Sequence, residues 1–151
     1  MVTIDELCEA WRINNAINLE LLSACPEETM DFKPGKGKTI RSNFVHLVSV
    51  RRMWIEDKMA KEAALVPKLD WKTAGRSEIE SALGVSCQLI QERFRLREQR
   101  VKPGAFPVIS FFAYCVAHEA HHRSQIEIAL RMGGVELDEK FLYGLWDWST
   151  K

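Results

Sequence analysis

Apolar residues recur at the spacing of an α-helix in four long segments of this chain, and helix-breaking residues separate the segments. No segment shows the sustained alternation of apolar and polar residues that marks a half-buried strand. Each segment is about 20 to 25 residues long and carries one apolar stripe, which must be buried against other helices. The pattern therefore predicts an all-α fold, a four-helix bundle.

Capping residues and breakers predict where the helices begin and end. The first helix begins after Thr3, which forms a capping-box pattern with Glu6, and fades near Cys25. The second begins after Thr39 and extends from residue 40 to about residue 64. The third helix begins at a second capping box, formed by Ser77 and Glu80, and ends at Lys102-Pro103-Gly104. The fourth helix extends from about Val108 to Met132 and stops at Gly133-Gly134.

The connections and the C-terminal tail have their own signatures. The stretches DFKPGKGK (31–38) and LVPKLDWKTAGR (65–76) are rich in turn residues and predict loops. The tail FLYGLWDWSTK (141–151) is aromatic and too short to stand free. We expect it either to fold back against the bundle or to cover a partner's surface.

Size and composition limit the classes of protein to consider. At 151 residues, with 46% hydrophobic and 28% charged residues, the chain suits a single helical domain over 1–151. Basic and acidic residues balance at 21 each, so no overall charge would attract nucleic acid or an anionic membrane. No apolar run reaches the roughly 20 residues of a membrane span, and MVTIDELCEAW does not resemble a signal peptide. We expect a soluble, cytoplasmic protein that binds neither nucleic acid nor membrane.

The cysteines and tryptophans predict a core rather than a reactive site. The four cysteines, Cys8, Cys25, Cys87 and Cys115, show no CxxC spacing, so we expect reduced residues buried in the core. The five tryptophans are expected to make core and surface contacts rather than a cofactor site, and they are Trp11, Trp54, Trp71, Trp146 and Trp148.

Three of the four histidines lie within the stretch HEAHHRSQI, residues 118 to 126. His118 and His122 are about 40° apart on the apolar side of the predicted helix, so both point inward. Such an i, i+4 pair can bind one first-row metal ion, but two ligands alone hold it weakly. A third imidazole would have to come from His46 on another helix. The spacing fits equally well with histidines that are satisfied by hydrogen bonds.

The letters HEAHH also match the HExxH motif of zinc proteases, in which Glu119 would be the general base. Such a protease takes a third ligand from downstream and keeps a sheet edge beside its site. Only acidic residues could serve as that ligand here: Glu127, Glu136, Asp138, Glu139 and Asp147. Because no strand is predicted, we disfavour a protease. Cys115, one turn before His118, is a candidate fourth ligand, although a small buried residue is the simpler interpretation.

The segments RSNFVHLVSVRRMW and AYCVAHEAHHRSQIEIALRMGG, followed by GLWDW, resemble the DinB-like family of metal-binding four-helix bundles. The likeness covers nearly the whole chain, and HHRxQI with an upstream histidine is its most specific part. The resemblance implies a three-histidine metal site at His46, His118 and His122, and a homodimer. Three nearby residues can also be compared with the family. His121 matches a family histidine that is generally not a ligand, and Ser124 replaces the usual glycine. Gln125 could orient a ligand or lie on the helix surface.

Three neutral imidazoles leave a metal ion with an open position, which is typical of a reactive site. We expect a divalent transition metal (Zn, Ni or Fe), since imidazole suits several ions. The resemblance implies a metal-dependent S-transferase that uses a low-molecular-weight thiol and a small electrophilic substrate. A non-enzymatic, stress-associated metal-binding bundle and a metal-dependent hydrolase stay open as alternatives. Basic residues at the mouth would suit such a thiol, and Arg51, Arg52 and Arg123 are candidates unless they are ordinary solvated arginines.

Overall fold

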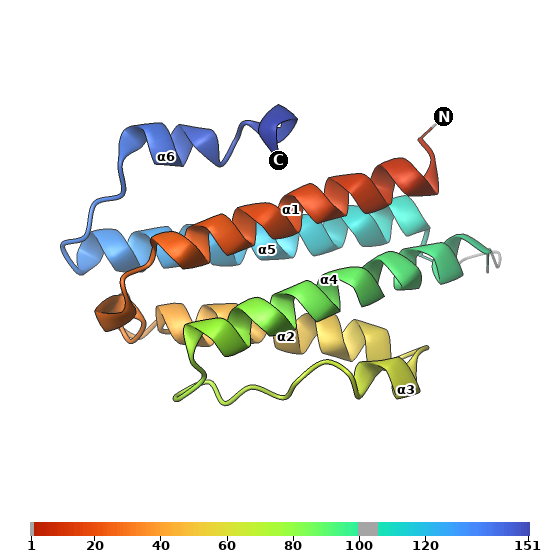
Figure 1. The fold of residues 1–151 in the computed structure, drawn as a ribbon, viewed down its shortest axis with the longest axis horizontal. Helices are drawn as coiled ribbons and strands as arrows, with labels where there is room; N and C mark the ends of the chain where they lie inside the picture. The colour runs from red at the N-terminus through yellow and green to blue at the C-terminus, as the bar shows by residue number, and fades with distance from the viewer. Residues whose placement is uncertain (1, 100–105) are drawn as a thin grey trace.

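The computed structural model describes residues 2–99 and 106–151, and its four long helices lie side by side (Figure 1). These helices are α1 (Ile4–Ala24), α2 (Ile40–Glu56), α4 (Arg76–Gln99) and α5 (Val108–Met132). The shorter elements are α3 (Ala60–Ala63), α6 (Glu139–Gly144) and 3-10 turns at Glu27–Thr29 and Trp148–Thr150. The described ranges contain no strand. The predicted all-α four-helix bundle is confirmed.

The long helices pack around a shared core. Helices α4 and α5 both contact α1 and α2, and they make a smaller contact with each other. The histidines lie on α2 and α5. These two helices are direct neighbours, so their facing side chains can meet.

Side-chain caps account for several helix ends. At the start of α1, Thr3 Oγ1 accepts from the backbone N–H of Glu6 at 3.2 Å, and the Glu6 carboxylate accepts from the N–H of Thr3 at 2.7 Å. Thr39 Oγ1 accepts from the N–H of Ser42 at 3.0 Å and starts α2. Helix α5 ends at Met132 with Gly133 as its cap. These predicted boundaries are confirmed.

The predicted end of the second helix is wrong. Helix α2 ends at Glu56 rather than near residue 64, and the short α3 follows after a break. The break turns Met59, Ala63 and Val66 into the core, where each is buried. Arg52 then donates to the carbonyl groups of Ala63 and Val66, which holds the chain in this turn. No glycine or proline marks the break, since long-range packing causes it.

The predicted start of the third helix is also wrong by a small shift. Helix α4 begins at Arg76, so Ser77 lies within the helix. The backbone N–H of Gly75 donates to the Glu78 carboxylate at 2.7 Å, so Glu78 takes the role predicted for Glu80. The predicted end at Lys102-Pro103-Gly104 lies outside the described residues.

Aromatic side chains fill the centre of the bundle. Trp11, Phe94 and Phe111 are fully buried, with ring centroids 5.8 Å apart for the first pair and 5.5 Å for the second. All four cysteines are buried and free, as predicted. Trp71 and Trp146 are instead 56% and 80% exposed, so they are not part of the core.

The C-terminal tail folds back against the bundle, which is one of the two predicted arrangements. Figure 1 shows α6 and the C-terminus alongside α1. Leu145 is buried, and the Lys151 ammonium contacts the Glu20 carboxylate at 2.6 Å. Among the helices of the described ranges, none is long and apolar enough to cross a membrane.

Candidate metal centre

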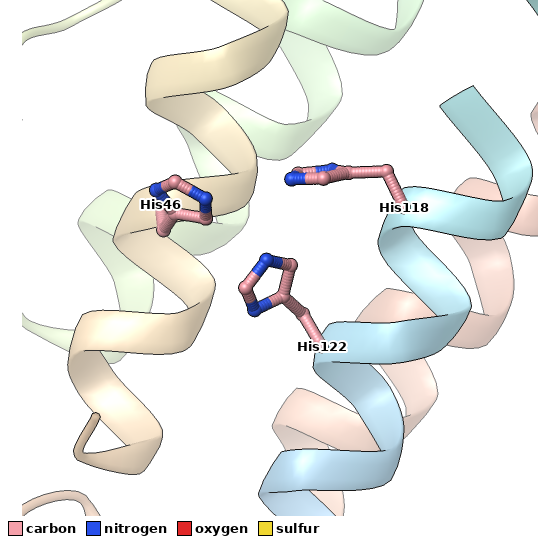
Figure 2. A group of neighbouring side chains, drawn as sticks. All are labelled: His46, His118 and His122. Atoms are coloured by element: carbon pink, nitrogen blue, oxygen red, sulfur yellow. The ribbon is translucent and has the colours of Figure 1, made fainter. Parts of the chain in front are cut away.

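Helices α2 and α5 bring the three predicted ligands together. His46 faces His118 and His122 across the gap between the two helices (Figure 2). One ring nitrogen from each imidazole lies within 4.8 Å of the other two, and the ring centroids are 4.6 to 5.3 Å apart. A tetrahedral ion with bonds of about 2.0 Å places its nitrogen ligands about 3.3 Å apart, so small ring rotations would complete such a site. The residues present therefore fit a bound metal ion.

Asn43 fixes the orientation of His122. Its side-chain N–H₂ donates to the backbone carbonyl of Thr39 at 3.0 Å and to that of Lys38 at 3.4 Å. A carbonyl can only accept, so the amide oxygen of Asn43 must face His122, whose Nδ1 lies 2.8 Å away. That nitrogen then carries the proton, and Nε2 keeps its lone pair free. A hydrogen bond of this kind typically orients a metal-ligating histidine.

All three imidazoles are held in the neutral form that a metal requires. Burial lowers the pKa of His46, His118 and His122, and that of His122 falls to about 4. The positive charge of Lys38 adds to the effect at each ring. At pH 7 these nitrogens therefore offer lone pairs rather than protons.

Glu119 follows His118 in the sequence but points the other way, into the core. Its carboxylate accepts from the Arg51 guanidinium at 2.6 and 2.9 Å and from the side-chain amides of Asn14 and Asn18 at 2.7 Å each. Burial would raise the pKa of Glu119, but the charge and hydrogen bonds of Arg51 outweigh it and hold this pKa below its usual range. A saturated carboxylate cannot activate water at the histidines. The geometry therefore contradicts the zinc-protease alternative.

Arg51 extends this contact into a polar network that joins all four long helices. It donates to Asn15 Oδ1 at 2.8 Å, to the Leu83 carbonyl at 3.0 Å and to Ser86 Oγ at 3.2 Å. Arg123 donates to the amide oxygens of Asn14 and Asn18. Because Arg51 and Glu119 lie on the two helices that carry the histidines, the network ties the ligand helices to each other.

The three arginines proposed for the mouth of the site make their hydrogen bonds elsewhere. Arg51 and Arg123 are 2% and 9% exposed within the network, and Arg52 binds the carbonyl groups after α3. That prediction is wrong, and so is the alternative that these arginines are freely solvated. Lys38, which was not predicted, is the basic residue whose charge acts on all three histidines.

The remaining candidates lie outside the histidine cluster. Cys115 is buried and is not among the side chains whose ligand atoms converge in the part of the chain that the structure describes. Burial raises the pKa of its thiol to about 12. His121 is exposed and pairs with Gln125 at 2.8 Å between Nε2 atoms, so Gln125 lies on the helix surface rather than at the site.

Sequence reasoning missed Asn43 and the Asn14–Asn18–Glu119 contacts. A signal for the second was present, because Asn14 and Asn18 interrupt the apolar stripe that Trp11 and Leu21 define on the first helix. A polar residue at a core position needs a buried partner. Asn43 gave no comparable signal, since its role depends on the backbone before α2.

Removal of the Asn43 side chain is expected to weaken metal binding. Asn43→Ala should raise the Kd for Zn²⁺ about 10- to 100-fold, the usual effect of losing the hydrogen bond behind a ligating histidine. Asn43→Asp keeps an acceptor for Nδ1–H and should bind closer to the unaltered protein. Isothermal titration measures both Kd values, and ¹⁵N shifts of His122 report its tautomer. Equal affinity and an unchanged tautomer in Asn43→Ala would contradict the positioning role.

Comparison with known proteins identifies the family. The model of the DinB family matches residues 1–146, which is nearly the whole chain. Comparisons with curated proteins and with solved structures give no match. The match agrees with the helical bundle and with the group of three histidines that could bind a metal ion. The chain therefore belongs to the DinB family.

Proposed function

We propose that this protein binds one divalent transition-metal ion through His46, His118 and His122 and acts as a metal-dependent S-transferase for a low-molecular-weight thiol. The observation that supports it best is the convergence of three neutral imidazoles with no fourth ligand among the described residues. Two of the histidines are half-buried, so the site can be reached from solvent. When bound, the ion supplies a positive charge that lowers the pKa of a coordinated thiol or water.

The protein's own thiols are unsuited to be the nucleophile. All four cysteines are buried, and burial raises the pKa of each, to about 12 for Cys25 and Cys115. A thiolate forms poorly at such a site, and an electrophile cannot reach it. A thiol nucleophile must therefore come from outside the chain. An external thiol meets that need.

Lys38 provides the positive charge that a thiolate or an acidic thiol would meet. Its charge acts on all three histidines, and partial burial lowers its own pKa. A cation whose charge acts on the three histidines favours an anion bound beside them. In this proposal Lys38 is the basic residue at the site, a role that the sequence suggested for the arginines.

Binding of a thiol to the cobalt-loaded protein tests this function. We expect glutathione and 2-mercaptoethanol to produce a sulfur-to-cobalt charge-transfer band, and S-methylglutathione to produce none. Loaded protein should then accelerate the reaction of glutathione with N-ethylmaleimide, and His118→Ala should remove both effects. Hydrolysis of p-nitrophenyl acetate without thiol would favour the hydrolase instead. Tight metal binding with neither reaction would favour the non-enzymatic alternative.

A further inference from the structure

A small cavity beside His118 is lined by residues of α1, α2, α4 and α5. Its volume is about 10 Å³, which is room for one group the size of a water molecule. Trp11, Trp54, Tyr114 and Cys115 contribute to its walls together with His118. One of the three converging histidines therefore borders this cavity as well.

Two buried donors at this cavity have no acceptor. The indole Nε1 atoms of Trp11 and Trp54 are buried and make no hydrogen bond in the described ranges. A buried N–H group without an acceptor is costly, so native structures rarely contain one. Both tryptophans line the same cavity, so an acceptor atom bound there would lie beside the two residues that carry these donors.

The surroundings favour a neutral acceptor over an ion. Arg51 and Glu119 also border the cavity, but they neutralise each other and their hydrogen bonds are already used. The Cys115 thiol stays protonated because burial raises its pKa to about 12. No unpaired charge among these groups would attract an anion or a cation. A carbonyl oxygen, with two lone pairs and no charge, suits the two indole donors.

Aromatic rings form the approach to this cavity. Tyr114 is 40% exposed, and its ring lies nearly parallel to that of His118, with centroids 6.0 Å apart. The Trp54 ring lies 5.7 Å from Tyr114 on the facing helix. Such walls suit apolar carbon atoms attached to the carbonyl group.

We propose that the cavity beside His118 is the subsite for the carbonyl oxygen of a neutral, mainly apolar substrate, which accepts from the indole N–H groups of Trp11 and Trp54. This role rests on the proposed function, because the cavity would hold the electrophile next to the metal-bound thiol. The cavity has room for a water molecule when the substrate is absent. The subsite itself needs no metal and can be tested without one.

Indole NMR signals of the metal-free protein provide the test, with cyclohexanone as the probe. The five tryptophans give five indole N–H signals, assigned by single Trp→Phe variants. Saturable downfield shifts are expected for Trp11 and Trp54, while the signals of Trp71, Trp146 and Trp148 stay in place. Cyclohexylamine has the same ring but is a cation without an acceptor, so it should leave all five signals unchanged.

Substitution separates a specific subsite from general ring contacts. Trp54→Phe keeps an aromatic ring but removes one donor, so cyclohexanone affinity should fall about fivefold, the effect of one hydrogen bond. Trp71→Phe removes an exposed indole and should leave the affinity unchanged. Equal shifts at all five indoles, no shift at all, or the same shifts with cyclohexylamine would overturn the subsite. Retained cyclohexanone shifts in a metal-loaded protein that neither binds glutathione nor accelerates its reaction would count against the transferase role alone.

Discussion

Replacement of His122 by alanine is expected to abolish metal binding. His122 is the most buried of the three ligands at 6% exposed, and its tautomer is set by Asn43. Without it, His46 and His118 remain as two ligands from different helices, which bind an ion weakly. The Kd for Zn²⁺ should rise by more than about 100-fold, above the effect of losing only a supporting hydrogen bond. Isothermal titration and elemental analysis of the purified protein measure the change.

His121→Ala is the matched control for this substitution. His121 is the next residue on the same helix, but it is exposed and contacts Gln125. Its removal should leave both the Kd and the metal content unchanged. A further readout is thermal unfolding, because an ion that binds only the folded state raises the melting temperature. Zn²⁺ should raise it for His121→Ala and not for His122→Ala, and a rise in both variants would contradict the assignment.

Replacement of Glu119 by glutamine is expected to cost about 3 to 5 kcal/mol of folding free energy, because it leaves the buried charge of Arg51 without a counter-charge. The hydrogen bonds that the side-chain amides of Asn14 and Asn18 donate to this carboxylate become weaker as well, because their acceptor loses its charge. Urea unfolding in the presence of a chelator measures the change without any contribution from metal. Asp5→Asn is the matched control, since it removes an exposed carboxylate that pairs with Arg95 and should change stability little.

The double variant Arg51→Met with Glu119→Leu separates the ion pair from the volume that it fills. It removes both charges of the pair, so part of the stability lost in Glu119→Gln should return. If Glu119 were instead a general base at the metal, Glu119→Gln would lose activity while keeping normal stability. That result would contradict the structural role of this carboxylate.

Local sequence signals predicted the helices well where the cause of the boundary is local. The fourth helix was located from Val108 to Met132 because Gly133 and Gly134 stop it, and the Thr3 and Thr39 caps depend on neighbouring residues. The end of α2 could not be predicted, since it depends on packing of Met59 and Val66 and on Arg52. The pattern of apolar residues continues through this break, so the pattern does not mark where α2 ends.

The same difference between local and long-range causes applies to the metal site. Helical spacing placed His118 and His122 on one face and left His46 as the one other histidine, and the resemblance then assigned it to the site. The direction of the Glu119 side chain could not be predicted, because a neighbour in sequence projects about 100° away on a helix and its partners lie on other helices. The homodimer, the cytoplasmic location and the single domain over 1–151 stay predictions.

X-ray absorption at the edge of the bound metal tests the three-histidine site most directly. The assignment predicts about three imidazole nitrogens at roughly 2.0 to 2.1 Å, with at least one further light ligand from solvent. His122→Ala should lose this shell together with the metal. Sulfur in the shell, or an unchanged imidazole shell in His122→Ala, would contradict it.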